Sequence, residues 1–458
     1  MVLGWGTAGA GHHSVMTCRH VISHAASLCI PPGHPTMRPA SSFFCFFILI
    51  LPPACAGAGH PWELSTEANA RTVVESYHNF EFDITGEGDD SWVHQRVQAL
   101  VELKRGDDFK IASELTWGDM WERQSELGPP DRDEGDFLQL FAQGRIVATG
   151  EDDLLVKVGR QILRYGSARL LSTREGANQR LAHDAFLLSW ERGERVRVDA
   201  FIAAPVATTP GLFDNRSHPD QTFFWSLYAV LPSPWQEESN FDLYYIGLSD
   251  KDSVFVPDGR ELRHTLGVRW WDDTGPWVRN TETIAQFGQA GERDILAGAV
   301  SLGAGRLLDA PMKPALMLRA DIISGGDGKG DLHTLHPLFQ ANNYFNEGGF
   351  ISPSNLYNIN PHITLEPRTG VDVRMGVNFQ WRFSDEDAIY APPLQPIGEP
   401  SPGTDRYLGT AFNVAVTWEI HDSAELSVGF TYHEAGPSLK AAGGKDVRYV
   451  QSALSVNF

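Results

Sequence analysis

The segment Val371–Arg382 reads VDVRMGVNFQWR, and its apolar and polar residues alternate. One set of alternate positions holds Val371, Val373, Met375, Val377, Phe379 and Trp381. The other set holds Asp372, Arg374, Gly376, Asn378, Gln380 and Arg382. Because successive side chains of a β-strand point to opposite faces, such a strand has one apolar face and one polar, charged face.

The same alternation recurs along the chain, for example at residues 195–202, 262–271, 316–322 and 424–433. No segment of comparable length shows a helical period. We therefore predict about 18 strands, near residues 73–84, 91–103, 107–119, 136–146, 151–162, 180–191, 193–202, 221–233, 240–250, 260–271, 275–287, 292–305, 313–323, 353–366, 369–382, 406–419, 422–434 and 446–458.

The connections between these strands alternate in length. Short turns are expected near Arg105-Gly106, Thr149-Gly150, Arg192-Gly193, Asp273-Thr274, Thr369-Gly370 and His421-Asp422. Long loops rich in Gly and Pro are expected at residues 120–135, 163–179, 203–220, 324–352, 383–405 and 435–445. Short periplasmic turns, long external loops and an even number of strands are typical of outer-membrane barrels. The predicted fold is therefore all-β: one closed antiparallel transmembrane β-barrel.

Composition excludes several other classes of protein. The chain has 458 residues and a formal net charge of −21, from 37 Lys and Arg against 58 Asp and Glu, so it is a poor nucleic-acid binder. No apolar stretch of about 20 residues occurs after the first 60 positions, which excludes a bundle of membrane-spanning helices. The four cysteines (Cys18, Cys29, Cys45 and Cys55) all lie near the start, so the body has no thiolate metal site or cysteine nucleophile.

The N-terminal region has the features of an export signal. Residues 43–51 read FFCFFILIL, Met37 and Arg38 precede this run, and Ala54-Cys55-Ala56 follows it. This order predicts a secretory signal peptide at residues 37–56. Residues 1–36 are then expected to be an over-extended start, with a genuine longer extension as the alternative. The rest divides into an N-terminal periplasmic segment at 57–72 and a barrel at 73–458.

Membrane placement follows from backbone chemistry and from aromatic residues. In lipid every backbone N–H and C=O must be paired within the protein, and strands achieve this only in a closed barrel. The last strand ends on the aromatic residue Phe458, as assembly signals of outer-membrane barrels usually do. Eight tryptophans suit aromatic girdles at the two interfaces: Trp117, Trp190, Trp225, Trp270, Trp271, Trp277, Trp381 and Trp418. The expected location is the outer membrane of a Gram-negative bacterium, in contact with its lipid.

If the apolar faces contact lipid, the polar faces line the lumen. The strand-borne cations there would be Arg96, Lys110, Arg197, Arg263, Arg269, Arg319, Arg374 and Arg382. The strand-borne acids would be Glu102, Glu114, Asp199, Asp321, Asp372, Glu419 and Glu425. Side-chain charges set ion selectivity in pores, and guanidinium groups stay charged while binding carboxylates. The alternative for each arginine is that it pairs with a neighbouring carboxylate and braces the wall.

Arg160 is a further pore-lining candidate. Simple alternation places Arg160 with Val158 and Ile162 on the apolar face, where a charge is costly. A bulge at Gly159 would turn Arg160 inward.

Arg160 also belongs to an ordered set of motifs: Gly159-Arg160-Gln161, then Tyr165-Gly166, then Arg169-Leu170. In this set the chain resembles the alginate export family of outer-membrane barrels, although His183-Asp184 departs from the Phe-Asp pair that usually follows. The later stretches His336-Pro337-Leu338-Phe339, Asn355-Leu356 and Asp387-Ala388-Ile389-Tyr390 extend the resemblance over roughly residues 70–458.

The resemblance implies an 18-stranded barrel whose electropositive constriction passes an anionic polysaccharide such as alginate, or another anionic solute. It also implies periplasmic assembly or secretion partners. Among the arginines, only Arg160 carries over from the family's motif. Three other functions stay open: a general porin for small hydrophilic solutes, an outer-membrane enzyme, and a periplasmic β protein that binds or cleaves polysaccharide.

Catalytic and metal sites have little support in the sequence. Mid-strand candidates for an enzyme are His183-Asp184 and His433, but adjacent strand residues face opposite sides. The loop acids Asp131, Asp133 and Glu134 match no calcium-loop spacing, so solvated charge is the better interpretation. We expect no cofactor and no metal.

Overall fold

A computed structural model of the protein describes residues 60–236, 238–272 and 274–458. The predicted signal peptide and the extended start lie outside the described residues. All the described strands belong to one compact unit that ends at Phe458. Within the described part of the chain, no helix is long and apolar enough to cross a membrane.

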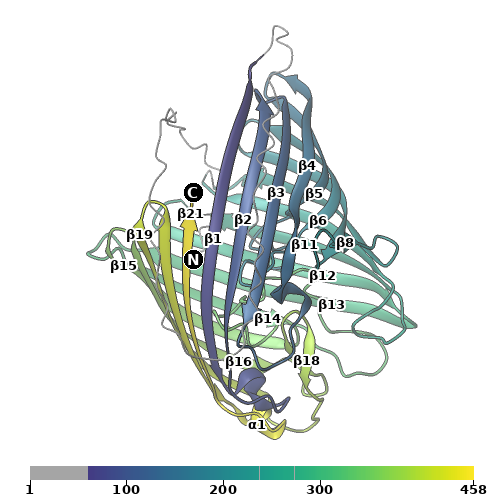
Figure 1. Ribbon diagram of the computed structural model, residues 1–458. Coiled ribbons are helices and arrows are strands. Elements are labelled where there is room, and N and C mark those ends of the chain that lie inside the picture. The colour runs from purple at the N-terminus through teal and green to yellow at the C-terminus, as the bar shows by residue number, and fades with distance from the viewer. Residues whose placement is uncertain (1–59, 237, 273) are drawn as a thin grey trace. The chain divides into compact units, whose positions relative to one another are not determined.

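Eighteen antiparallel strands form a closed wall, because β1 pairs with β2 on one side and with β21 on the other (Figure 1). The closed barrel and its predicted strand number are thus confirmed. The wall consists of β1 (Trp62–His78), β2 (Asp90–Arg105), β3 (Phe109–Trp121), β4 (Asp133–Thr149), β5 (Asp152–Gln161), β6 (His183–Arg192), β7 (Val196–Ala207), β9 (Thr222–Pro232), β10 (Asn240–Asp250), β11 (Glu261–Asp272), β12 (Trp277–Ala290), β13 (Arg293–Leu307), β14 (Ala315–Ile323), β15 (Leu356–Arg368), β16 (Val371–Arg382), β19 (Tyr407–His421), β20 (Ala424–Ala435) and β21 (Val447–Asn457).

The remaining described elements are short and lie in the long connections. Strand β8 (Arg216–Ser217) pairs with the end of β7, and β17 (Ile389–Ala391) pairs with β18 (Gln395–Gly398). Two 3-10 turns, η1 (Phe80–Asp83) and η2 (Pro129–Asp131), and one helix, α1 (Pro437–Ala441), complete this set.

The first strand starts earlier than predicted. Strand β1 begins at Trp62, and its residues are paired with β2 from Trp62 onward. The predicted boundary at residue 73 is therefore wrong, and most of the expected 57–72 segment belongs to the wall. The reason lies in the outward positions in the middle of this stretch, where Thr66, Ala68 and Ala70 follow the large apolar Trp62 and Leu64, so the alternation there is weak.

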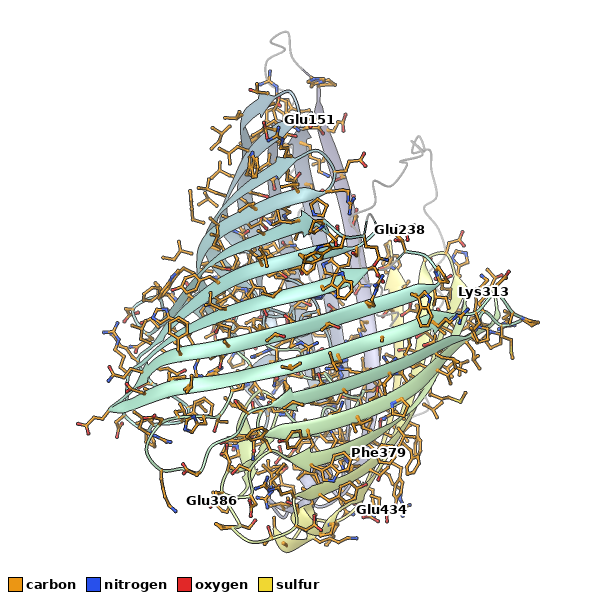
Figure 2. The ribbon with its side chains drawn as sticks, turned by 180° about the vertical axis from the view of Figure 1, so that it is seen from behind. Glu151, Glu238, Lys313, Phe379, Glu386 and Glu434 are labelled. Carbon is orange, nitrogen blue, oxygen red and sulfur yellow. The ribbon has the colours of Figure 1, made fainter. Side chains whose placement is uncertain are left out.

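The two ends of the barrel differ in the length of their connections. Figure 2 labels Glu151, Glu238 and Lys313 in short connections at one end, and Glu386 and Glu434 at the other. At this second end the connections include residues 162–182, 324–355 and 383–406. In outer-membrane barrels the short turns face the periplasm, so we call these ends periplasmic and external.

Burial along the strands is the reverse of that in a soluble protein. On β16, Met375 and Phe379 are 38% and 37% exposed, whereas Asn378, Gln380 and Arg382 are fully buried. A soluble sandwich would bury the apolar face in its core. Exposed apolar side chains around a polar interior match a wall that contacts lipid outside and encloses polar groups.

The predicted girdle tryptophans do not all point outward. Trp277 and Trp418 are exposed at the periplasmic ends of their strands, and Arg306 and Arg368 lie 5.0 and 4.8 Å from the respective ring centroids. Trp271 is an exception, because its indole N–H donates to Asp242 inside the barrel. The expectation for Trp271 was wrong, since adjacent Trp270 and Trp271 necessarily face opposite sides of the strand.

Candidate functional site

The strand register places most of the predicted pore-lining residues on the inner face. Directly opposite residues of an antiparallel pair share a face, and Arg269, Glu282, Ser301 and Asp321 lie opposite one another across four strands. The same reasoning, with burial, puts these candidates inside: Arg96, Lys110, Arg197, Arg263, Arg269, Arg319, Arg374 and Arg382. Whether solutes contact them stays a prediction.

Arg160, unlike the other candidates, lies on the outer face of the wall. The register runs without a shift through Gly159, and Arg160 lies opposite Leu140, which is 45% exposed on the outer face. The expected bulge is therefore absent at this position. Gly159 instead permits close approach of two strands: its φ is +124°, and a Cβ there would lie 2.3 Å from the carbonyl oxygen of Leu140.

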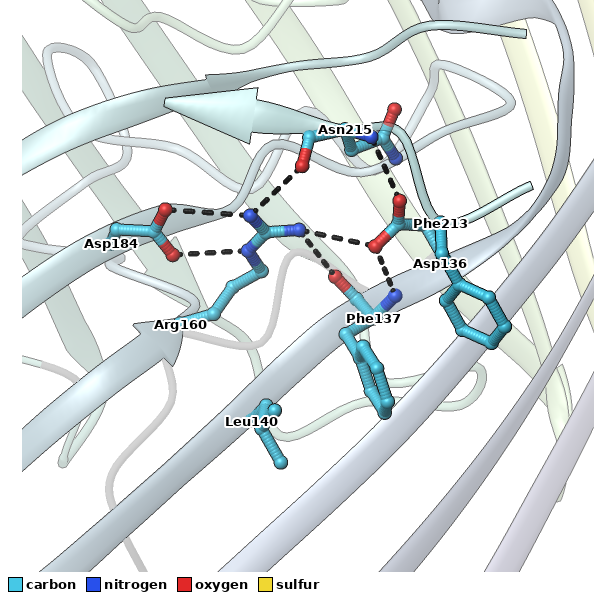
Figure 3. Close-up of a pocket in the computed structure, with 7 residues that line it drawn as sticks. All are labelled: Asp136, Phe137, Leu140, Arg160, Asp184, Phe213 and Asn215. Atoms are coloured by element: carbon cyan, nitrogen blue, oxygen red, sulfur yellow. Dashed lines mark hydrogen bonds and ion pairs between the residues drawn. The ribbon is translucent and has the colours of Figure 1, made fainter. Parts of the chain in front are cut away.

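Two acids compensate the charge of Arg160 on the outer face (Figure 3). The guanidinium donates to Asp184 through Nε at 3.0 Å and to Asp136 through Nη1 at 3.2 Å. It also donates to the backbone carbonyls of Phe137 and Asn215, at 3.3 and 3.1 Å. Arg160 therefore ties three chain segments together at the external rim.

Three ion pairs of inner-face arginines share one feature: the guanidinium is more exposed than its carboxylate partner. Arg197 is 48% exposed and its partner Asp199 is 1% exposed, with Nη2 and Oδ2 2.5 Å apart. Arg319 and Asp321 are 24% and 0% exposed, and Arg374 and Glu347 are 32% and 19% exposed. At each of these pairs the guanidinium is thus more exposed than its carboxylate partner.

Four other inner-face arginines are deeply buried. Arg263 bonds Glu261 and Gln286, Arg269 bonds Asp242 and Asn280, and Arg382 donates to two backbone carbonyls and two hydroxyls of the loop that follows it. Arg96 is the fourth, and its partner Glu175 belongs to a loop. These four arginines therefore match the alternative given in the sequence analysis, in which the arginine binds neighbouring groups and braces the wall.

A loop at residues 162–182, between β5 and β6, folds into the barrel; we call it the first inward loop. Its Arg169 donates through Nε to Glu282 at 2.8 Å and through Nη1 to Asp321 at 3.0 Å. Those acids belong to β12 and β14, which lie in a part of the wall distant from β5 and β6. Gly166 of the same loop lies against Tyr228, where a Cβ would be 2.7 Å from the tyrosine oxygen.

The other part of the first inward loop is attached to the first strands. Arg96 and Arg180 each form an ion pair with Glu175, at 2.6 Å. Burial alone would raise the pKa of Glu175, but the charges of Arg96 and Arg180 outweigh it and lower that pKa. Asn178 donates to the backbone carbonyl of Asp119 at 3.1 Å. The loop thus spans the lumen from β2 and β3 to β12 and β14.

A second inward loop, residues 324–355 between β14 and β15, meets the first. Phe339 N–H donates to the carbonyl of Leu170 at 2.8 Å, and Ser172 N–H donates to the carbonyl of Phe339 at 2.9 Å. Tyr344 of this loop packs under the guanidinium of Arg319, 3.8 Å from its ring centroid. Backbone hydrogen bonds therefore join the two inward loops inside the barrel, and we call the joined loops the barrier.

The family-like motifs of the sequence lie at this barrier. Gly159 and Arg160 end the strand before the first loop, Arg169 anchors that loop, and Phe339 joins the second loop to it. Asp387 accepts hydrogen bonds from Gly326 N–H and the Thr334 hydroxyl in the second loop, at 2.7 and 2.6 Å. These motif residues hold the external half of the lumen in its packed form.

Strand alternation missed several cations, of which Lys157 and Arg174 are two; Arg71, opposite Arg96 on the inner face, is another. Lys157 lies on the inner face opposite Gln143 and Leu187, with Nζ 3.8 Å from the centroid of the Phe141 ring. Arg174 belongs to the first inward loop, and burial lowers its pKa to about 10, so it stays charged at neutral pH. Lys157 was identifiable from the alternation of VKVG, but Arg174 sits in a loop where no period applies.

The catalytic candidates are not assembled into a constellation. His183 is fully buried against the rings of Phe224 and Phe339, whereas Asp184 faces outward to Arg160. His433 packs against Phe82 and Phe350. In the described part of the chain, no group of three or more His, Cys, Asp or Glu residues is placed to hold a metal ion.

A closed 18-stranded barrel with apolar residues outside and polar groups inside defines the class of outer-membrane channels. Solved porins of Pseudomonas aeruginosa have the same fold: OccK2 (OpdF) in complex with glucuronate, at TM-score 0.57 and 11% identity, over 86% of this chain and 98% of that one. OccK5 (OpdH) follows at TM-score 0.55 and 10% identity, over 86% and 98% of the two chains.

The family is shown by a family model, "Alginate export", which matches residues 62–452. The chain belongs to the alginate export family, and it is an outer-membrane channel for solutes. A comparison with curated proteins finds no match.

Proposed function

We propose that the channel conducts anionic cargo, either an anionic polysaccharide such as alginate or another anionic solute. The observation that carries this proposal is the geometry of the inner-face ion pairs. Arg197, Arg319 and Arg374 extend into the lumen while their carboxylate partners are more buried. An anion therefore meets guanidinium groups, which bind carboxylates through charge-assisted hydrogen bonds.

Two further features support anionic cargo. Lys157 and Lys110 flank the ring of Phe141 on the inner face, at 3.8 and 5.5 Å, and add positive charge to the periplasmic half. OccK2, which shares the fold, was solved in complex with glucuronate, a sugar that carries a carboxylate. Family membership adds alginate export as the expected transport process.

The test is single-channel recording of the double variant Arg197→Gln, Arg374→Gln under a salt gradient. A unit charge at 4 Å contributes about 1 kcal/mol in water, so the permeability to anions should fall about fivefold for each charge that an anion contacts, and the anion-to-cation permeability ratio should fall by at least that factor. The control is Lys313→Gln, which removes an equally charged group that is 74% exposed in the β13–β14 turn. Equal ratios in all three proteins would contradict the proposal.

A general porin for small hydrophilic solutes is the second candidate, and the inward loops favour it. The two hydrogen-bonded loops cross the external half, which leaves less room for a polymer than for a small solute. A short alginate oligosaccharide added on the periplasmic side separates the candidates. The anionic conduit predicts that current through the wild type is blocked, and that the double variant is blocked less. A general porin predicts no difference between them.

A further inference from the structure

A pocket opens on the outer face of the wall near the external rim (Figure 3). It is lined by Asp136, Phe137, Leu140, Arg160, Asp184, Phe213 and Asn215. Its volume of about 560 Å³ is in the range of small-ligand sites. Because Leu140 and Arg160 lie opposite each other on the outer face, this pocket faces lipid rather than the lumen.

The depth of the pocket follows from the strand register. Val158, Phe186 and Ile202 form one outward row across β5, β6 and β7, and they are 49%, 43% and 51% exposed. The next outward row toward the external end begins with Arg160 and Asp184. The apolar band therefore ends just below the pocket, where the acyl chains of the outer leaflet give way to headgroups.

A loop supplies the apolar side of the pocket. Residues 208–215 leave β7 and return to β4, where Phe213 N–H donates to the carbonyl of Gly135 at 2.9 Å. The Phe213 ring lies 5.4 Å from that of Phe137, and its side chain is 52% exposed. With Leu140, these rings offer an apolar surface that opens toward the membrane.

The polar side of the pocket offers a ligand hydrogen-bond acceptors rather than donors, because the N–H groups of Arg160 already donate to other protein groups. The guanidinium of Arg160 donates to both oxygens of Asp184, to Asp136 and to two backbone carbonyls. Asp184 keeps 38% of its side chain exposed. One arginine and two aspartates leave the lining with one excess negative charge, so a phosphate is disfavoured and a hydroxyl or amino donor is favoured.

We propose that this pocket binds a glycolipid of the outer leaflet. Its acyl chains lie against Leu140, Phe137 and Phe213, and a sugar hydroxyl donates to the carboxylate of Asp184. The site is separate from the lumen, and the proposal does not depend on the cargo of the channel.

The test is native mass spectrometry of the protein purified from outer membranes and exchanged into detergent. The two probes are a diacyl glycolipid with an uncharged sugar head and phosphatidylglycerol with the same acyl chains. We expect glycolipid adducts to exceed phosphatidylglycerol adducts on the wild type. Phe213→Ser should lower glycolipid binding about tenfold. Its matched control is Leu227→Ser, because Leu227 is also 52% exposed on the outer face but lies outside the pocket.

A second variant, Asp184→Asn, keeps the size of the side chain and removes the excess negative charge. It should narrow the difference between the two lipids, and it serves as the test if Phe213→Ser fails to fold. Three results would overturn the proposal: equal glycolipid loss in Phe213→Ser and Leu227→Ser, equal binding of the two lipids by the wild type, or a lipid preference that Asp184→Asn leaves unchanged.

Discussion

The periplasmic and external halves of the lumen are built from the same kind of strand, yet they differ in what fills them. In the periplasmic half, Arg197 and Arg374 keep 48% and 32% of their side chains exposed. In the external half, Arg263 and Arg382 are fully buried beneath loops. The comparison teaches that an inner-face arginine is a candidate solute contact only where the loops leave part of its side chain exposed.

The largest effect is expected from locking the two inward loops together. Leu171 and Phe339 form a parallel bridge, and no cysteine follows residue 55, so Leu171→Cys with Phe339→Cys would give a single engineered disulfide. If cargo passage requires the loops to separate, the oxidised variant should lose polysaccharide passage and regain it on reduction. Transport assays with and without reductant check this. Undiminished passage through the oxidised form would show that the barrier need not open.

A second variant, Arg169→Met, should loosen the packing of the external half and so reduce its difference from the periplasmic half. Arg169→Met leaves Glu282 and Asp321 without their loop partner, and breaking such a buried pair costs about 3–5 kcal/mol. Faster amide hydrogen exchange in residues 162–182 and larger, noisier conductance are the expected results. The matched control is Arg164→Met, since Arg164 is exposed in the same loop. Similar exchange in both variants would argue against the anchoring role.

Acid should also weaken the attachment of the first inward loop to the wall, by less than Arg169→Met does. The folded-state pKa of Glu175 is lowered from 4.5, so its stabilising contribution is present above pH 4.5 and is lost as the pH falls through the lowered pKa. A charge-assisted hydrogen bond is worth about 1.5–3 kcal/mol. Amide hydrogen exchange of residues 174–180, compared between about pH 7 and about pH 3, measures how much of this stabilisation is lost when Glu175 is protonated. In Glu175→Gln the pH dependence should shrink, and an unchanged profile would refute this origin.

The smallest effect on ion selectivity is expected from removing a single cation of the periplasmic half, Lys157. Lys157→Gln should lower the anion-to-cation permeability ratio by less than about twofold, because salt screens one charge beyond a Debye length of about 10 Å. Reversal potentials at about 0.1 M salt, where this screening length applies, give the ratio. Lys251→Gln, in the exposed loop after β10, is the control. A ratio that rises in Lys157→Gln would mean that this lysine repels rather than attracts the conducted ion.

The wall could be predicted from sequence because strand alternation is local. The alternation at residues 371–382 predicts which side chains face lipid, and in β16 Met375 and Phe379 are exposed whereas Asn378, Gln380 and Arg382 are buried. β1 was placed too late because its outward Thr66, Ala68 and Ala70 are small or polar. Arg160 was misplaced because a strand glycine permits either a bulge or close approach, and sequence does not distinguish them.

The packing of the lumen could not be predicted, because its partners are far apart in the chain. Arg169 and Asp321 are separated by 152 positions, and the loop that carries Arg169 has no period to follow. One local signal was available: a cation and an acid two positions apart on one strand share a face. This spacing occurs in Arg197-Val198-Asp199 and Arg319-Ala320-Asp321, both of which form ion pairs.

The backbone bonds between Leu170, Ser172 and Phe339 have a mechanical consequence. Neither inward loop can withdraw while its neighbour stays, unless these bonds break first. Traffic through the barrel would then be governed by one concerted transition with two conductance levels, and a recording with evenly graded intermediate levels is not what such a paired barrier produces.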